Sequence, residues 1–174
     1  MNPSSAARRS VTTLVASLAA VALLSGCGAI QNALGGAADA QRDEPGGQIT
    51  AASQADVFSL QVGDCLDQSA ESAGEIESLP VVPCSDPHDG EIYAELELPA
   101  GDFPGADAVN ARADEFCIAE FEPFVGVAYE DSELYFWSMT PLEAGWQALD
   151  DRVVQCVLDT APELVTGSLA GSGR

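Results

Sequence analysis

The sequence predicts an α+β domain in which a small antiparallel or mixed sheet carries a packed helix and two disulfides. Three observations support this class: a stretch with period-two alternation, a stretch with helical periodicity, and four cysteines in the second two thirds of the chain. The chain has 174 residues, which is the usual size of one domain with a short extra segment. We therefore expect a single folded domain built around a sheet.

The clearest strand is residues 91–98, where apolar and polar side chains alternate. One set is expected to face the core: Ile92, Ala94, Leu96 and Leu98. The other set is expected to face water: Tyr93, Glu95 and Glu97. Shorter apolar stretches predict further strands at 57–66, 81–84, 134–139 and 152–158. The sheet is thus expected to be dry on one face and wet on the other.

A helix is predicted over residues 106–121, because apolar positions recur there every three or four residues. These positions are Val109, Ala113, Phe116, Cys117 and Phe121. Pro123 is expected to end the helix. Residues 140–143 predict a capped helical turn with Pro141 at its first helical position. The predicted order is therefore β-β-β-α-β-α-β.

Four cysteines remain for the folded part once Cys27 is assigned to the N-terminal segment: Cys65, Cys84, Cys117 and Cys156. An even number of cysteines outside the cytoplasm predicts two disulfides, with three possible pairings. Sequential pairing closes loops of 19 and 39 residues, which contribute roughly 3 and 4 kcal/mol, and it ties the helix to the last strand. A four-cysteine zinc site is the alternative, but the chain has no Cys-x-x-Cys knuckle. No metal or other cofactor is predicted.

The first residues have the pattern of a bacterial lipoprotein signal peptide. Arg8 and Arg9 precede an uncharged stretch at 10–23, and Leu24-Ser25-Gly26-Cys27 follows. This ending resembles a lipobox, which implies removal of residues 1–26 and a diacylglycerol group on the Cys27 sulfur, often with acylation of the new amine. An ordinary secretory signal with an incidental cysteine is the alternative. The expected location is the extracytoplasmic face of the cell membrane, held by the lipid anchor.

Two further segments are expected to lie outside the folded domain. Residues 27–55 comprise the lipidated cysteine and a stretch of small and polar residues without an aromatic side chain, which predicts a flexible tether. Residues 166–174 are also small and polar, and they predict a disordered tail. The folded domain is therefore expected at 56–165.

The chain is strongly acidic. It has 28 Asp and Glu against six Lys and Arg, and its formal net charge is −22. All acids follow Cys27 and there is no lysine, so the mature form would carry a charge of about −24. Nucleic acid and bare anionic lipid are therefore not expected as partners. The carboxylates are expected to form a solvated, repulsive surface, and loose binding of divalent cations or of a basic partner is the alternative.

Three segments carry a recognisable set of motifs: residues 63–67 (GDCLD), residues 83–93 (PCSDPHDGEIY), and Trp146 followed by 151–156 (DRVVQC). Together they resemble the septum formation family of actinobacterial exported proteins. The chain departs from the family pattern at Asp150, where a glycine usually precedes Asp-Arg. The resemblance implies a cell-surface module linked to division and envelope assembly, and it assigns no reaction.

His88 is the chain's single histidine and lies in a turn-forming segment at 85–90. It is a candidate metal ligand with Asp86, Asp89 and Glu91, or a pH sensor beside these carboxylates. The alternative, which we prefer, is a ring that hydrogen-bonds the turn and packs beside a bridge between Cys65 and Cys84.

Trp137 and Trp146 are candidates for a contact surface, with core packing as the preferred alternative. Arg152 is expected to pair with an acid on a neighbouring strand, and anion binding is the lesser alternative. The chain shows no catalytic triad or oxyanion-hole signature, so no enzyme is predicted. We expect a non-catalytic adaptor that binds an envelope or division protein. A divalent-cation-responsive surface protein and a cell-wall hydrolase with an unrecognised site are the alternatives.

Overall fold

The computed structural model describes residues 39–68 and 76–174, which belong to one compact unit. Its elements are β1 (Ser53–Asp56), β2 (Cys65–Leu66), β3 (Ser78–Val82), β4 (Gly90–Glu97), α2 (Ala106–Val125), β5 (Tyr135–Met139), α3 (Glu143–Ala148) and β6 (Val153–Asp159). The predicted signal peptide and Cys27 lie outside the described residues. Within these residues, we find no helix with the length and apolar character needed to cross a membrane.

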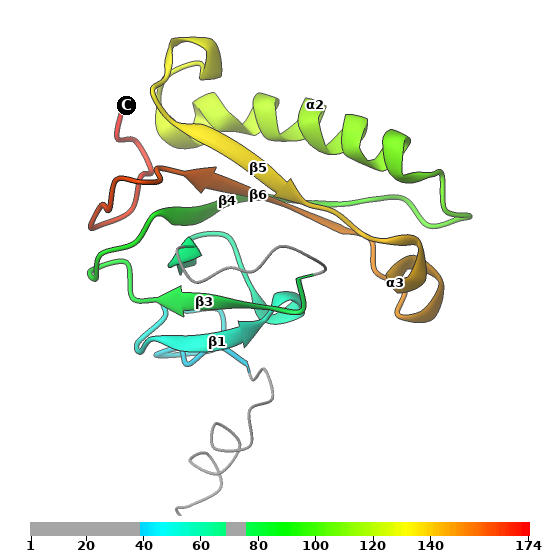
Figure 1. Ribbon diagram of the computed structural model, residues 1–174, viewed down its shortest axis with the longest axis horizontal. Coiled ribbons are helices and arrows are strands. Elements are labelled where there is room, and N and C mark those ends of the chain that lie inside the picture. Colours follow the sequence, from blue (N-terminus) through cyan, green and yellow to red (C-terminus); the bar gives the residue numbers. More distant parts are fainter. Residues whose placement is uncertain (1–38, 69–75) are drawn as a thin grey trace, which may run out of the picture. The chain divides into compact units, whose positions relative to one another are not determined.

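The six strands form one antiparallel, curled sheet in the order β1-β3-β2-β4-β6-β5 (Figure 1). The α+β prediction is confirmed, and the sheet is antiparallel. Both disulfides are present with sequential pairing, Cys65–Cys84 and Cys117–Cys156. The second disulfide joins α2 to β6, as predicted. The sheet has one strand more than expected, because β1 precedes the first predicted strand.

Two apolar cores lie on opposite faces of the sheet. α2 covers one face of β4, β6 and β5 (Figure 1). Its buried residues follow the predicted helical spacing: Val109, Ala113, Cys117, Phe121 and Val125. The second core lies between β1 and β3 on one side and β4 and β6 on the other. Its buried residues include Ala55, Leu79, Val81, Ile92 and Val157. Because both faces of the central strands are covered, the expectation of one wet face is wrong there.

β4 shows this difference most clearly. Its first five residues are all buried, including Tyr93, which was expected to face water. The pairing of β4 with β6 shifts between Ile92 and Ala94, which is a bulge. The bulge turns Tyr93 into the α2 core while Ile92 faces the second core. Simple alternation cannot reveal an inserted residue of this kind.

Three element boundaries differ from the predictions. Residues 57–66 were expected to be one strand, but Val57–Ser59 is a 3-10 turn and only Cys65–Leu66 pairs in the sheet. α2 continues through Pro123 to Val125, and Gly126 ends it with a φ of 93°. A proline in the last turn forfeits only one hydrogen bond, and Val125 is fully buried. Pro141 lies before α3, whose N-cap is Leu142 without a side-chain cap.

Both terminal segments belong partly to the fold. The expected tether is wrong for residues 39–55, because β1 lies there and Ile49 is only 6% exposed. The expected disordered tail is also wrong, because Leu169 is 4% exposed. Gly171 and Gly173 donate backbone hydrogen bonds to the last carbonyls of α2. The last carbonyls of a helix have no hydrogen-bond partner within the helix. They are therefore free to accept the backbone N–H groups of a polar, glycine-rich tail.

Candidate functional site

The described residues form an open groove of about 940 Å³, bordered by β5, α3 and residues 56–61. Its floor and walls carry many apolar side chains: Val57, Phe58, Leu60, Ile76, Trp137, Met139, Leu142, Leu149 and Val153. Four carboxylates also line it: Asp56, Glu77, Glu95 and Asp151. No Lys, Arg or His is among the described residues that line the groove.

Several large apolar side chains at this groove are open to solvent. Phe58 is 61% exposed, Leu142 49% and Leu149 67%. Clustered exposure of large apolar groups is uncommon on a monomeric protein and marks interaction sites. The groove therefore combines an apolar surface with exclusively negative charge.

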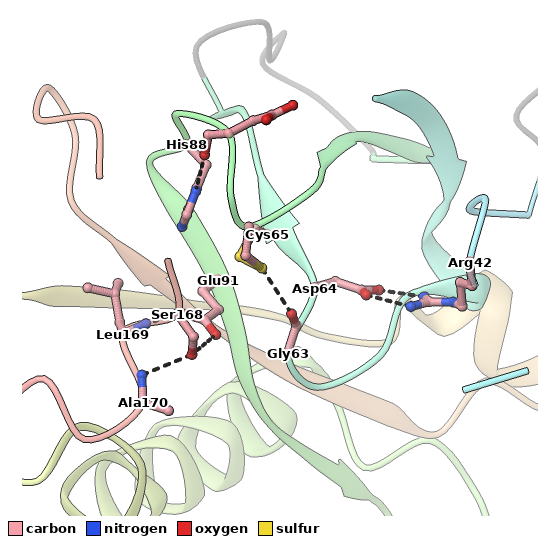
Figure 2. The surroundings of a disulfide bond; sticks show 11 residues. Arg42, Gly63, Asp64, Cys65, His88, Glu91, Ser168, Leu169 and Ala170 are labelled. Atoms are coloured by element: carbon pink, nitrogen blue, oxygen red, sulfur yellow. Dashed lines mark hydrogen bonds and ion pairs between the residues drawn. A yellow bond between two sulfur atoms is a disulfide. The ribbon is translucent and has the colours of Figure 1, made fainter. Parts of the chain in front are cut away.

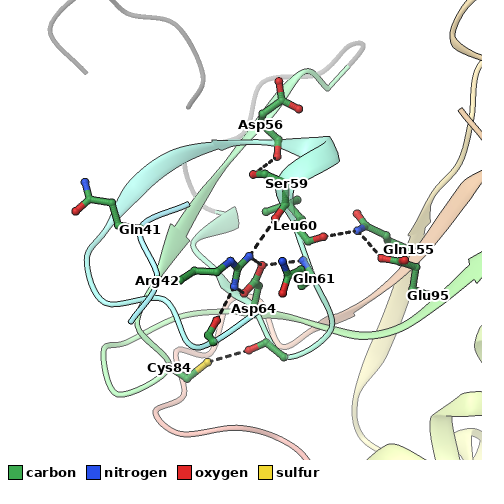
Figure 3. A network of polar contacts seen from close by, with 12 residues as sticks. Gln41, Arg42, Asp56, Ser59, Leu60, Gln61, Asp64, Cys84, Glu95 and Gln155 are labelled. Carbon is green, nitrogen blue, oxygen red and sulfur yellow. Dashed lines mark hydrogen bonds and ion pairs between the residues drawn. The ribbon is translucent and has the colours of Figure 1, made fainter. Parts of the chain in front are cut away.

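The wall formed by residues 56–61 is held by a buried ion pair (Figure 3). Both nitrogens at the end of Arg42 donate to the Asp64 carboxylate over 2.6 Å, and Arg42 also donates to the Ser59 carbonyl. The Asp64 hydrogen bond raises the pKa of Arg42. The backbone N–H of Gln61 donates to Asp64 as well. Asp64 of the Gly-Asp-Cys motif therefore fixes the groove wall and holds the chain around Arg42 beside it.

Gln155 connects this wall to the sheet. Its side-chain amide donates to the Leu60 carbonyl at 3.1 Å and to the Glu95 carboxylate at 3.2 Å (Figure 3). Gln155 lies on β6 and Glu95 on the neighbouring strand β4. The amide thus holds one lining carboxylate in place within the groove.

The α3 side is held by Trp146 and Arg152. Trp146 is 4% exposed and donates to the Gly101 carbonyl, and the Arg152 guanidinium lies 3.8 Å from the centre of its ring. Arg152 also pairs with Asp150 at 2.8 Å. The expectation of a partner on a neighbouring strand is therefore wrong for Arg152. Trp146 is enclosed, as in the core alternative, and Arg152 is enclosed with it.

Asp150 has a φ of 57°, the left-handed conformation that glycine adopts most easily. The resemblance noted in the sequence implies a glycine at this position. Asp tolerates this conformation better than most residues. The backbone of the turn is therefore kept although the glycine is absent, and the Asp150 carboxylate gains the ion pair with Arg152.

Trp137 lies beside the groove on β5 and is half-buried. Its indole N–H donates to the Gln68 side chain at 2.6 Å, and its ring packs against the second core. The exposed aromatic residue of this strand is Tyr135, at 68%. Trp137 therefore lines the groove while its indole N–H and its packing against the second core hold it in the fold.

His88 lies in the interior of the domain. Its ring is fully buried, and Nδ1 is 2.8 Å from the Asp86 carbonyl oxygen (Figure 2). Because a carbonyl only accepts, Nδ1 carries the proton. The His88 backbone pairs with Val165 of the C-terminal segment. The expectation that the His88 ring hydrogen-bonds the turn agrees with this geometry.

Glu91 is also fully buried, close to the Cys65–Cys84 bridge. The Ser168 hydroxyl and the Leu169 N–H each donate to its carboxylate at 2.6 Å (Figure 2). Burial raises the pKa of the Glu91 carboxyl, and these two hydrogen bonds and His88 oppose that rise. Glu91 is therefore an anchor for the C-terminal segment.

The candidate metal set around His88 is not assembled in the described residues. Asp86 is exposed, while Asp89 is 4% exposed and accepts from the Gln68 backbone. The one cluster with metal-ligand spacing found there contains Glu91 with Cys65 and Cys84, whose sulfurs are joined in a disulfide. Within the described residues, His88, Asp89 and Glu91 therefore hold the turn and the C-terminal segment through hydrogen bonds.

Sequence reasoning missed most of the groove. Leu142 and Leu149 flank α3 in the sequence, and Phe58 was placed in a strand. The sequence carries only a weak signal for this surface, because all it shows is that these three large apolar residues lie close to acidic and turn-forming residues. Only the arrangement of three segments distant in sequence makes these side chains one surface.

Comparison with known proteins is consistent with the motif analysis. A family model described as Septum formation matches residues 26–162. The chain belongs to this family. The description points to division or the cell envelope as the setting of its function. No curated protein and no solved structure gives a significant match.

Proposed function

We propose that this member of the Septum formation family is a lipid-anchored, non-catalytic adaptor on the extracytoplasmic face of the cell membrane. Its groove binds another protein of the envelope or the division machinery. The observation that carries the proposal is the groove itself, with Phe58, Leu142 and Leu149 exposed around an apolar floor. Exposed apolar clusters of this kind mark sites of association.

The chemistry of the lining supports binding over catalysis. The described lining residues include four carboxylates and two hydroxyls, Ser138 and Thr140, but no His, Cys, Lys or Arg. A nucleophilic hydroxyl needs a base within hydrogen-bond reach. Thr140 donates instead to the Asn110 side chain. The groove therefore offers contact area and charge to a partner.

The lipid anchor is part of the proposal and rests on the Leu-Ser-Gly-Cys sequence. Replacing Cys27 with Ala removes the acceptor sulfur, so the protein is expected to leave the membrane fraction. Fractionation of cells that express either form tests this step. A wild-type protein whose mass shows no diacylglycerol group on Cys27 would contradict the lipid anchor.

The adaptor role is tested by retrieval from crosslinked envelopes. The wild-type protein is compared with Leu149→Asp, which places a charge on the groove rim, and with the matched control Ile118→Asp. Ile118 is a 43% exposed residue of α2 outside the groove. We expect division or wall-synthesis proteins with the wild type and the control, and their loss with Leu149→Asp.

All three proteins must first be shown to be folded and oxidised. Equal retrieval by Leu149→Asp and Ile118→Asp would contradict the assignment of the groove. Retrieval of no specific protein by the wild type would contradict the adaptor role.

A further inference from the structure

The partner's chemistry can be read from the groove and the strand beside it. We propose that the groove binds an extended peptide segment with alternating basic and apolar side chains, which adds to the free edge of β5 as a further strand. This inference rests on the proposed function, since it names the part of the partner that the adaptor would hold.

The free edge of β5 is the first observation. β5 lies at one end of the strand order and pairs with β6 alone in the described part of the chain. Successive residues of β5 and its end line the groove, from Trp137 to Thr140. Alternate side chains of a strand point to opposite faces, so consecutive residues line one groove when the strand's edge borders it. The unpaired edge of β5 therefore borders the groove, whose floor continues over Val153 and Gln155 of β6 and Glu95 of β4.

The composition of this edge is the second observation. Natural proteins protect sheet edges with charged residues, proline, bulges or very short strands. β5 has the sequence Tyr-Phe-Trp-Ser-Met over its five residues and contains none of these residue types. The opposite edge strand, β1, has four residues and ends in Asp56. An unprotected edge next to an apolar groove suits strand addition by a peptide.

Charge complementarity defines the side chains of the peptide. All four charged residues of the described lining are acids, and Glu77 and Glu95 are exposed. These like charges favour Lys or Arg on the bound segment and disfavour acids. Phe58, Leu142 and Leu149 provide contacts for apolar side chains between the basic ones. Neighbouring side chains of an extended segment point in opposite directions, so a basic side chain and the apolar one beside it can contact different walls of the groove.

The direct test uses three synthetic peptides of matched length and the oxidised wild-type domain. In the first, Val alternates with Lys. In the second, Glu replaces each Lys. The third has the first sequence with N-methyl groups on all backbone nitrogens, which removes the main-chain donors of both edges and keeps the charge. Calorimetry or fluorescence of the half-buried Trp137 measures binding at near-physiological salt, where interactions between distant exposed charges are largely screened.

We expect the Lys peptide to bind and the Glu peptide not to bind. The N-methylated peptide should bind at least about tenfold more weakly, which corresponds to about 1.4 kcal/mol. Equal binding of the Lys peptide and its N-methylated form would overturn strand addition. Binding of the Glu peptide as strong as that of the Lys peptide would overturn the charge assignment.

Two double variants with the same change in net charge separate the groove from the general acidity of the chain. Glu77→Gln with Glu95→Gln removes charge from the groove, and Glu120→Gln with Glu122→Gln removes it from exposed positions of α2. Binding of the Lys peptide is expected to weaken several-fold in the first variant and to change little in the second. Equal weakening in both would overturn the groove as the binding site.

The proposed function and this inference fail in different ways. If the Leu149→Asp protein loses its envelope partner but no peptide binds the wild type, the adaptor role stands and the strand-like partner is wrong. If sedimentation shows that the wild type dimerises and that Leu149→Asp abolishes the dimer, the groove's occupant is a second copy, and the peptide is overturned. If peptides bind as expected but no envelope protein is retrieved, the proposed function is wrong.

Discussion

The two faces of the curled sheet differ in how completely they are covered. On the α2 face, the helix, the Cys117–Cys156 disulfide and residues 165–174 enclose the apolar side chains. On the other face, β1 and β3 cover Ile92 and Val157, but the part beside β5 and α3 stays open as the groove. The chain itself encloses the apolar side chains of one face, whereas part of the other face stays exposed as the groove.

Polar groups show the same contrast. On the closed face, the buried Tyr93 hydroxyl donates to the Cys117 carbonyl, and the buried Glu91 carboxylate accepts from Ser168 and Leu169. Around the groove, Glu77 and Glu95 are exposed to water. Buried contacts on both faces stabilise the fold, and the open part of the second face is the binding surface that we propose. The predictions below test this division.

The largest effect is expected from deleting residues 166–174 on the closed face. The deletion removes both donors from the buried Glu91 carboxylate, and hydrogen bonds to charged groups contribute about 1.5–3 kcal/mol each. We expect the free energy of unfolding to fall by about 3–6 kcal/mol, measured by urea unfolding. Arg174→Ala, which removes only exposed ion pairs with Glu133 and Glu163, should cost less than about 1 kcal/mol. Similar stability of the two proteins would contradict the role of the tail.

Breaking the ion pair that holds the groove wall is expected to have the next largest effect. Arg42→Ala leaves the Asp64 carboxylate buried at 3% side-chain exposure without its cation. Removing one partner of a buried pair costs about 3–5 kcal/mol. The exposed pair of Arg112 with Glu115 provides the control, and Arg112→Ala should cost at most about 1 kcal/mol. Urea unfolding that ranks the two variants equally would show that Asp64 does not depend on Arg42.

A smaller effect concerns the pH dependence that Glu91 adds to the closed face. Burial raises the pKa of Glu91 above its ordinary value of 4.5, so the folded state binds this proton more tightly than the unfolded chain. The contribution of Glu91 to stability is therefore largest below about pH 4.5 and is lost as pH rises through the raised pKa of the folded state.

Glu91→Gln removes this titration. The free energy of unfolding should then fall less steeply above pH 4.5 than in the wild type. The total difference between the two proteins is about 1.4 kcal/mol for each pH unit by which the pKa of Glu91 in the folded state exceeds 4.5. Urea unfolding at closely spaced pH values measures the slope. Glu97→Gln, at an exposed position of the same strand, should keep the wild-type slope. Identical slopes for wild type and Glu91→Gln would contradict the raised pKa.

The smallest effect on stability is expected at the groove. Leu149→Ala should change the free energy of unfolding by less than about 0.5 kcal/mol, because Leu149 is 67% exposed. Binding of the Lys peptide should nevertheless weaken. Trp146→Ala, in the neighbouring α3 but 4% exposed, should cost about 3–5 kcal/mol. A large loss of stability in Leu149→Ala would mean that the open face also holds the fold together.

Several features followed from the sequence alone because they depend on local pattern or on covalent chemistry. Helical spacing predicted the buried face of α2, and an even number of cysteines predicted two disulfides. The Gly-Asp-Cys and Pro-His motifs identified the family, which the match over residues 26–162 confirms. The strands β5 and β6 were also placed closely, since each is a short apolar stretch between turns.

The tertiary structure decided what depends on contacts between distant segments. The bulge at Tyr93, the Arg42–Asp64 pair and the docking of residues 165–174 leave no periodic signal, because each joins residues far apart in the chain. The groove is of the same kind: residues 56–61, β5 and α3 form one surface only after the sheet curls. Local sequence sets which side chains are apolar or charged, but their joint exposure depends on how the rest of the chain packs.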